Sequence, residues 1–223
     1  MFMHAAEIWQ AFPDLAAGAV TVEGAYAGAA SLDGLHAQAA ARLAAGPEGE
    51  FPEIQAWRRA FTKLGLKPTQ YRCASEALLR RVRQSGTIPA LHPLIDLCNA
   101  VSLATALPVA VFDLTQIGGS LTVRFARGDE RFEAFSGELE TPPAGEVIFA
   151  DAAGNAHARR WCNRQGRRAA VGPATTRALI VVEALHADAA RDIQTALTQL
   201  TERLGPQAHQ PMRLTAQNPL YRF

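Results

Sequence analysis

The chain has 223 residues, of which 48% are hydrophobic and 19% are charged, and its formal net charge is +1. This composition excludes a disordered chain, the charge excludes a general polycation, and the length allows one large domain or two small ones. Among the basic residues, lysine occurs only at Lys63 and Lys67. Arginine grips phosphate with two parallel hydrogen bonds, although an arginine-rich genome explains the same count.

The cysteines and the hydropathy pattern bear on the compartment. Cys73, Cys98 and Cys162 form no Cys-x-x-Cys pair, which argues against a disulfide framework or a zinc site and favours a reducing compartment. No apolar stretch approaches the ~18 residues that a membrane-spanning helix needs, and the start lacks a signal-peptide pattern. We therefore expect a cytoplasmic protein.

The first 70 residues are predicted to be mostly helical. A strand ends near Val22, Ser31 caps an alanine-rich helix that runs to about Ala45, and Pro52 starts a stronger helix that Gly65 closes. The apolar stripe of this stronger helix consists of Ile54, Trp57, Phe61 and Leu64.

Two more helices precede the strands. Ser75 is predicted as an N-cap, and Pro93 starts a helix that runs to about Ala106. From Pro108 onward the hydrophobic period changes to two. The expected later elements are a strand over 121–125, a hairpin over 147–162, a buried strand over 178–182 and an amphipathic helix over 193–204.

Helices thus crowd the first half and the C-terminal part, with strands between them. This order predicts the α+β class, with a mostly antiparallel sheet or sandwich core flanked by helices. We expect a single domain over residues 1–205, made of a helical part (1–70) and a core (71–205). After Gly205-Pro206 the chain has no period, so residues 206–223 are predicted to be an irregular tail.

Polar side chains on the helix after Pro93 are the first candidate site. Asp96 and Asn99 are neighbours on one face, and His92 lies one turn earlier on the same ridge. Such a ridge also has a plain explanation, since it can face solvent, and His92 stands where an N-cap is common.

Glu183 is the second candidate. It follows a run of apolar residues that predicts a strand buried on both faces. An unpaired carboxylate buried there costs several kcal/mol or holds its proton. Glu183 therefore either faces a polar pocket or forms a structural ion pair.

The third candidate is the arginine-rich segment 159–168. Arg160 and Arg164 flank Trp161, and arginine beside an aromatic ring can grip a ribose-phosphate chain and stack a base. A basic hairpin on a solvated face is the alternative. Thr175 follows shortly after, either as a pocket hydroxyl or at the start of a strand.

Three motifs together resemble a known family. They are Pro93-Leu-Ile-Asp-Leu-Cys-Asn99, Leu107-Pro-Val-Ala-Val-Phe-Asp113 and Gln116-Ile-Gly-Gly119. In this order they are similar to the editing domain, also called the B-three/four domain, of the β subunit of bacterial phenylalanyl-tRNA synthetase. The likeness extends from about Ile8 to Leu204, and free-standing relatives share the Arg-Arg-Trp-x-x-Arg-Gln stretch that begins at Arg159.

The resemblance implies roles for several residues. Asn99 aligns with an asparagine that lines the editing pocket, and Asp96 with a structural aspartate. Glu183 aligns with the glutamate that recognises the phenolic hydroxyl of a misattached tyrosine. Ala110 stands where the family has its pocket histidine, and Trp161 lies where the synthetase has a glycine-rich segment, so the local pocket differs.

From this resemblance we expect a tRNA-binding trans-editing deacylase that hydrolyses mischarged aminoacyl-tRNA. Asn99 and Glu183 would form the catalytic pair in one shared hollow, and Arg160, Trp161, Arg164 and Thr175 would bind the substrate. The alternative is a non-catalytic module for tRNA or an amino-acid-like ligand, which Ala110 favours. A third possibility is an unrelated hydrolase acting on a small ester or amide.

Other chemistry is not indicated. The sequence contains no ATP-binding motif, no Gly-x-Ser-x-Gly elbow, no His-Glu-x-x-His pair and no metal-ligand cluster. We therefore expect no cofactor, no metal and no aminoacyl-tRNA ligase activity by this chain alone, and the sequence favours no particular oligomeric state.

Overall fold

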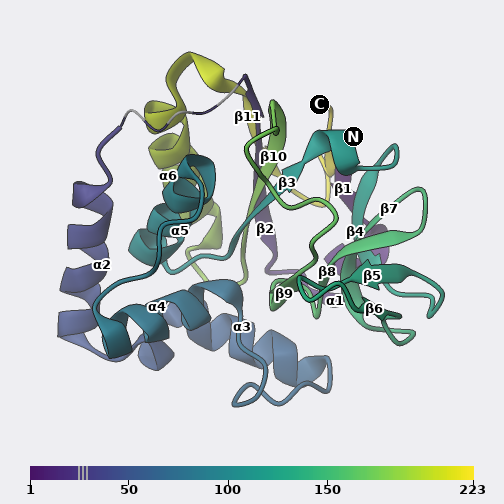
Figure 1. The fold of residues 1–223 in the computed structure, drawn as a ribbon. Coiled ribbons are helices and arrows are strands. Elements are labelled where there is room, and N and C mark those ends of the chain that lie inside the picture. The colour runs from purple at the N-terminus through teal and green to yellow at the C-terminus, as the bar shows by residue number, and fades with distance from the viewer. Residues whose placement is uncertain (25, 27, 29) are drawn as a thin grey trace.

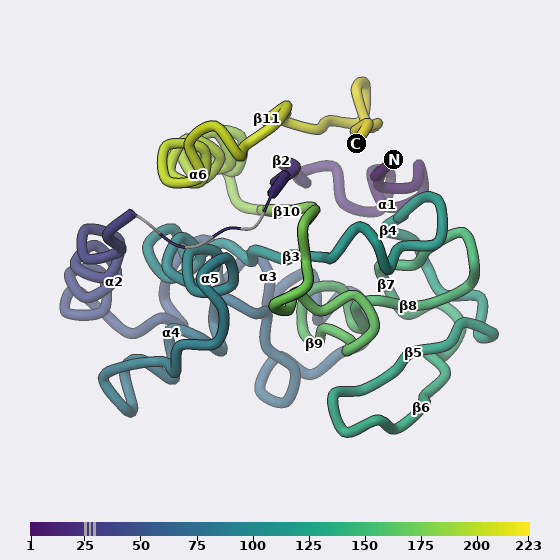
Figure 2. The backbone as a smooth tube through the Cα atoms, turned by 45° about the horizontal axis from the view of Figure 1, so that its top comes forward, coloured from purple at the N-terminus to yellow at the C-terminus, as the bar shows by residue number. Residues whose placement is uncertain are grey.

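The computed structural model describes residues 1–24, 26, 28 and 30–223. Figures 1 and 2 show three parts side by side: a group of helices, a small central sheet, and a larger sheet on the far side of the small one. This arrangement confirms the predicted α+β class with a mostly antiparallel core flanked by helices.

The small sheet is antiparallel throughout and has β10 and β2 in its interior. Its order is β11 (Ala208–Leu214), β2 (Ala16–Glu23), β10 (Arg177–Ala184) and β3 (Val109–Asp113). The larger sheet has mixed strand directions, because β1 runs parallel to β4 and β5 runs parallel to β8. Its order is β12 (Leu220–Tyr221), β1 (Phe2–His4), β4 (Leu121–Phe125), β7 (Val147–Asp151), β8 (Asn155–Arg159), β5 (Arg131–Glu133) and β6 (Leu139–Glu140), with β9 (Arg164–Gln165) paired to β8.

The α-helices flank these sheets (Figure 1). They are α1 (Ala6–Ala11), α2 (Asp33–Ala45), α3 (Pro52–Lys63), α4 (Ala74–Ser85), α5 (Pro93–Thr105) and α6 (Ala189–Leu204). Short 3-10 helices occupy Glu48–Glu50, Leu114–Gln116 and Gly205–Gln207.

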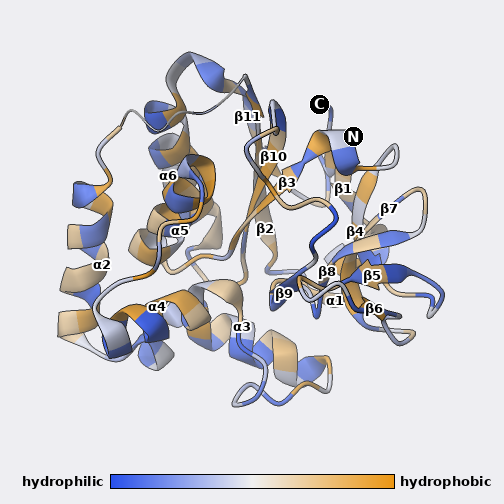
Figure 3. Ribbon diagram, in the orientation of Figure 1, coloured by the Kyte–Doolittle hydropathy of each residue, from blue (hydrophilic) through white to orange (hydrophobic). Residues whose placement is uncertain are grey.

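Strand β10 is buried on both faces, as its unbroken apolar sequence predicts. Leu179 and Val181 belong to the hydrophobic cluster shared with the larger sheet, whereas Ile180 and Val182 belong to the cluster shared with the helices. Figure 3 shows β2, β10 and β3 of the small sheet mostly in the hydrophobic colour. The small sheet is therefore the middle layer of the molecule.

Helix α6 packs closely on this middle layer at Gly18 of β2. A Cβ atom at that position would lie 2.9 Å from Cγ2 of Ile193 and 3.0 Å from Cδ1 of Leu197. Since such contacts are shorter than carbon atoms tolerate, glycine is what permits the helix to approach the strand.

The boundaries of α5 follow the predicted signals. Pro93 occupies the first turn, and Nδ1 of His92 accepts a hydrogen bond from the backbone N–H of Leu94 at 3.2 Å. The helix ends at Ala106, which adopts a left-handed conformation with φ 58°. His92 is thus an N-cap.

Three local expectations are wrong. Residues 206–223 are not an irregular tail, because β11 pairs with β2 and β12 pairs with β1. The core is not confined to residues 71–205, because the mostly helical residues 1–70 also supply β1 and β2 to the two sheets. Ser75 is not an N-cap, because α4 begins at Ala74 and Cys73 holds the cap position.

Within the described residues, no helix is both long enough and apolar enough to span a bilayer.

Candidate functional site

Glu183 lies near the end of β10, where the strand leaves the middle layer. Its side chain is buried, with only 2% of the residue exposed. Strand pairing fixes its position, since Glu183 pairs with Ala17 of β2 and its backbone N–H donates to the carbonyl of Pro108 at 3.3 Å. A carboxylate held this deeply in an apolar layer needs hydrogen-bond donors.

Two donors meet one oxygen of this carboxylate. Nε1 of Trp161 donates to Oε1 of Glu183 at 2.7 Å, and Nε2 of His4 lies 2.6 Å from the same oxygen. Because an indole nitrogen can only donate, Oε1 acts as an acceptor there, and the imidazole is best placed to donate as well. Both donors are fully buried.

The second oxygen, Oε2, remains available. Among the residues that the structure describes, none donates a hydrogen bond to it. Glu183 is therefore fixed through Oε1 and can accept a donor from a ligand through Oε2.

Trp161 reaches Glu183 from a strained turn between β8 and β9. Arg160 and Trp161 both have positive φ, 47° and 59°, a conformation that costs about 1–2 kcal/mol for each non-glycine residue. The turn is held because the N–H of Trp161 donates to the carbonyl of Val147 and the N–H of Arg160 donates to Glu146. Strain of this kind persists where surrounding structure enforces it, often at functional sites.

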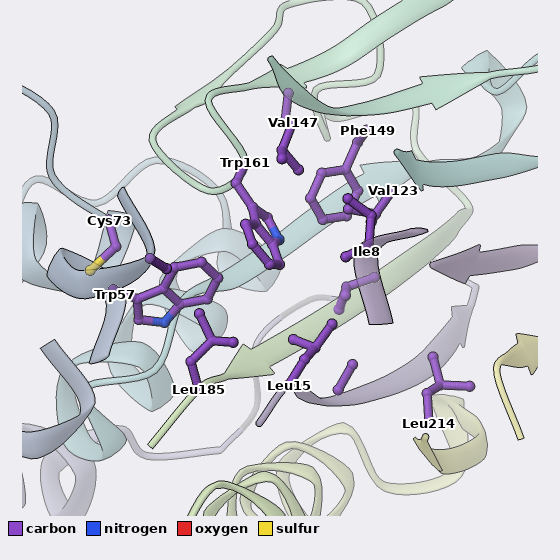
Figure 4. Packing of buried hydrophobic residues seen from close by; sticks show 14 of the residues in the cluster. Ile8, Leu15, Trp57, Cys73, Val123, Val147, Phe149, Trp161, Leu185 and Leu214 are labelled. Atoms are coloured by element: carbon purple, nitrogen blue, oxygen red, sulfur yellow. The ribbon is translucent and has the colours of Figure 1, made fainter. Parts of the chain in front are cut away.

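The indole ring is enclosed by other rings. Its centroid lies 4.8 Å from that of Phe12 and 4.9 Å from that of Trp57, and both contacts are edge-to-face. Figure 4 shows Trp161 between Trp57 on one side and Val147 and Phe149 on the other. With no exposed surface, Trp161 has no free face for the base stacking expected from the sequence.

A small pocket of about 70 Å³ lies beside Glu183. Its lining includes Pro108, Ala110, Trp161, Asn163, Gln165 and Glu183. The amide nitrogen of Asn163 donates to the carbonyl of Arg72 at 2.8 Å, and that of Gln165 donates to the carbonyl of Val111 at 2.7 Å. Each amide therefore uses one of its two N–H groups to hold the neighbouring backbone, and Glu183 contributes a carboxylate to the same pocket.

Gly166 keeps this part of the chain close to the larger sheet. A Cβ atom there would lie 2.9 Å from Cε2 of Phe132 and 3.1 Å from the carbonyl oxygen of Glu133. Glycine at this position therefore allows the segment that carries Gln165 to pack against its neighbours.

Of the two arginines expected to bind the substrate, one lines the pocket and the other does not. Arg164 lines it, but its guanidinium pairs with Glu140 at 2.7 Å and lies 5.2 Å above the ring of Phe132. Arg160 is not among the lining residues and stacks 4.6 Å from the ring centre of Tyr71. Figure 3 shows the chain around β9 in the hydrophilic colour. These side chains form a basic rim, not the interior of the pocket.

The remaining expected residues lie elsewhere. Asn99 is half-buried on α5 and is not among the described residues that line the Glu183 pocket, so the two side chains do not share this pocket. Asp96 accepts a hydrogen bond from the N–H of Leu91, which is a structural role. Thr175 is buried and donates to Oδ2 of Asp113 at 2.6 Å, which ties the start of β10 to the end of β3.

Cys162 also lines the pocket. Burial raises the pKa of its thiol well above the ordinary value of 9.0. The thiol is therefore neutral near pH 7 and is a poor nucleophile.

One group of possible metal ligands lies away from this pocket, at Glu53, His186 and Asp192, whose ligand atoms are within 4.8 Å of one another. Glu53 already accepts two hydrogen bonds of 2.8 Å from Arg42, and His186 pairs with Asp192 at 2.8 Å. Ion pairs with protein partners explain this cluster.

Sequence reasoning missed His4. It lies in a three-residue strand too short to show a period, and its partner Glu183 is 179 positions away. The only available signal was indirect: a buried carboxylate at Glu183 requires donors, and histidine is one of the few side chains that can supply one in a core.

The comparisons with known proteins agree with the sequence motifs. A model of the B3/4 domain family matches residues 56–206. The phenylalanine–tRNA ligase beta subunit of Legionella pneumophila (strain Lens) is 36% identical over 74 residues, which are 33% of this chain and 9% of that protein. The corresponding subunit of Photorhabdus laumondii is 32% identical over 86 residues, 39% of this chain and 11% of that protein.

A solved structure gives a weaker likeness. The N-terminal fragment of the phenylalanyl-tRNA synthetase beta subunit from Pyrococcus horikoshii aligns with a TM-score of 0.42 and 14% identity, over 54% of this chain and 41% of that one. The chain spans only about a tenth of the length of the curated relatives above. Since the family model covers more than half of the chain, the predicted resemblance is confirmed, and the chain belongs to the B3/4 domain family.

Proposed function

We propose that this chain binds tRNA and hydrolyses the ester bond of a mischarged aminoacyl-tRNA. The observation that carries the proposal is the Glu183 carboxylate, which is held through Oε1 by His4 and Trp161 while Oε2 is left for a ligand. Relatives that match part of this chain are named as beta subunits of phenylalanine–tRNA ligases, and this supports tRNA as the ligand.

In this proposal the pocket receives the side chain of the amino acid, and Glu183 accepts a hydrogen bond from it. Water adds to the ester carbonyl, the acyl–oxygen bond breaks, and the products are the free amino acid and tRNA with its 3′-terminal hydroxyl restored. The hydroxyl next to the ester on the ribose is close enough to position that water, so the reaction needs no protein base.

The rim supports binding of the RNA backbone. Arg160 lies on the turn that carries Trp161 and Arg164 begins β9 directly after it, and arginine forks match phosphate geometry. Arg164 is partly exposed, and exchange of its partner Glu140 for a phosphate would keep the charge paired.

A panel of mischarged tRNAs tests the proposal. Purified protein should release amino acid from at least one of them faster than buffer does, and Glu183→Gln should lower that release while tRNA binding persists. The exposed Glu202→Gln on α6 is the matched control and should leave release unchanged. Release no faster than buffer for every tRNA would defeat the deacylase.

A non-catalytic binding module is the second candidate, and one observation favours it. Ala110 lines the pocket and offers neither a donor nor a base, and the neutral Cys162 thiol offers no nucleophile. Retained tRNA binding without turnover in the same assay would support this candidate. An unrelated esterase is distinguished by competition, because bulk tRNA would not inhibit it.

A further inference from the structure

The Glu183 pocket is small because Trp161 fills the space beside the carboxylate. The indole is fully buried and packed edge-to-face against Phe12 and Trp57, so its position is fixed on several sides. The space that remains is about 70 Å³. For comparison, a cavity of ~150 Å³ holds benzene, and a water molecule takes ~30 Å³ in the liquid.

An aromatic side chain therefore does not fit beside Glu183 in this structure. A group of a few heavy atoms does. A phenol or phenyl ring needs more room than this pocket offers unless the close-packed side chains around it move.

The polar groups of the pocket define the chemistry of the small group. Oε2 of Glu183 lacks a donor from the described residues, and the amide nitrogens of Asn163 and Gln165 are engaged with backbone carbonyls. The one guanidinium in the lining, that of Arg164, is paired with Glu140. The carboxylate oxygen Oε2 is an acceptor without a donor among the described residues, so it favours a ligand group that donates a hydrogen bond.

The backbone at Trp161 is strained, so placing the indole ring beside Glu183 costs conformational free energy. Trp161 has φ 59°, a conformation that glycine adopts without strain. A glycine at this position would relieve the backbone and would open the pocket. The turn thus carries a large ring at a position where glycine would be less strained.

We propose that Trp161 is a specificity-determining residue that restricts the Glu183 pocket to short aliphatic side chains whose tip donates a hydrogen bond, as a hydroxyl or an ammonium group does. This inference rests on the proposed function only in taking the ligand to be an aminoacyl group. Trp161 acts in two ways, since its ring limits the volume and its N–H engages Oε1, which leaves Oε2 for the ligand.

The test uses adenosine that carries an aminoacyl group on its 3′ position through an amide, which cannot be hydrolysed. Four analogues are compared by calorimetry with the full chain: seryl, 2,3-diaminopropionyl, alanyl and tyrosyl. The seryl or the diaminopropionyl analogue should bind roughly ten- to hundredfold more tightly than the alanyl analogue, because their side chains supply a donor to the carboxylate and that of alanine does not. The tyrosyl analogue should bind no better than the alanyl one.

Two variants isolate the ring from its N–H group. Trp161→Gly should gain affinity for the tyrosyl analogue by tenfold or more, whereas Trp161→Phe keeps a ring in place and should still reject it. Trp161→Phe should also weaken binding of the preferred analogue, because it removes the donor to Oε1. Circular dichroism and thermal unfolding establish that each variant is folded.

Several results would overturn the inference. They are equal binding of the seryl, diaminopropionyl and alanyl analogues, tyrosyl binding as tight as the best of the others, absence of binding by all four, and no gain of tyrosyl binding in a folded Trp161→Gly. The ranking in the unaltered chain decides the question on its own if Trp161→Gly does not fold. If the analogues bind in the predicted order but the protein hydrolyses no aminoacyl-tRNA, the proposed deacylase activity is wrong and this inference still holds.

Discussion

The imidazole of His4 meets the carboxylate of Glu183 at 2.6 Å, although 179 positions separate the two residues in the chain. His4 belongs to β1 of the larger sheet, and Glu183 belongs to β10 of the small sheet. This contact therefore joins the two sheets at the candidate pocket. A change at either residue should affect both the stability of the fold and the properties of the site.

His4→Ala should lower the free energy of unfolding by about 1–3 kcal/mol, because it leaves a buried carboxylate with one donor fewer. Urea unfolding at neutral pH measures this. His36→Ala is the control, since His36 is exposed on α2 and should change stability by less than about 0.5 kcal/mol. Equal stability of both variants would contradict the structural role of His4.

Arg159→Ala should destabilise the chain strongly. The Arg159 guanidinium is buried and donates to both oxygens of Glu146, at 2.9 and 3.0 Å, and also contacts Glu140. Removal of one partner from a buried ion pair costs about 3–5 kcal/mol. Arg159→Lys should recover only part of this, because lysine has no planar fork.

Arg191→Ala is the control for that prediction. Arg191 is exposed on α6 and pairs with Asp188 and Asp192 at the surface. Exposed pairs of this kind contribute about 0–1 kcal/mol. A loss at Arg159 no larger than the loss at Arg191 would show that the buried pair does not hold the turn before Trp161.

Stability should fall on acidification in two steps. Burial holds the pKa of His157 below its ordinary 6.5, so the unfolded chain takes up this proton first and stability declines as the pH falls below 6.5. Burial alone would raise the pKa of Asp151, but hydrogen bonds from Asn155 and Gly118 lower it to about 2. The stabilisation from Asp151 is thus complete above 3.8 and is lost as the pH falls toward about 2.

Urea unfolding at a series of pH values checks these steps. Asp151→Asn should flatten the decline between pH 3.8 and about 2 and should lower stability at neutral pH. Asp129→Asn, an exposed aspartate of the neighbouring loop, should leave the profile unchanged. The same acid slope in Asp151→Asn as in the unaltered chain would contradict the assignment.

Deletion of residues 206–223 should prevent stable folding. The deletion removes β11 and β12, and it removes the buried side chains of Leu214 and Tyr221, including the hydrogen bond between Tyr221 and Thr21 at 2.9 Å. Deletion of 222–223 alone is the control, and it retains both strands. Thermal unfolding by circular dichroism compares the two chains, and equal midpoints would show that these strands do not contribute.

Binding of tRNA should weaken as salt is added, if arginines of the rim contact phosphates. Arg164→Ala should weaken binding and reduce the slope of log affinity against log salt by about one. Arg191→Ala, far along the chain on α6, should leave the slope unchanged. Filter binding between low and moderate salt measures both, and an unaltered slope in Arg164→Ala would exclude a phosphate contact there.

Much of the fold is predictable from local pattern. The apolar stripe after Pro52, the cap before Pro93 and the unbroken apolar run of β10 correspond to observed elements. Glu183 could be identified from the sequence because burying a carboxylate at the end of an apolar strand is unfavourable unless a partner or a polar pocket stabilises it.

Elements that depend on distant partners were not predictable. The residues of β11 are mostly exposed and show no alternation, so only pairing with β2 makes them a strand. Asn99 was expected to face Glu183, but helical spacing fixes only which residues of α5 share a face, not what that face meets. The burial of Trp161 likewise follows from Phe12 and Trp57, which come from other parts of the chain.

The position of β1 has a consequence for the order of assembly. Phe2 pairs with Leu121 on one side and with Tyr221 on the other, so β1 cannot pair until residues far along the chain have been synthesised. His4 cannot reach its carboxylate before residue 183 has been synthesised. The contact that joins the two sheets at Glu183 can therefore form only after both β1 and β10 have been synthesised.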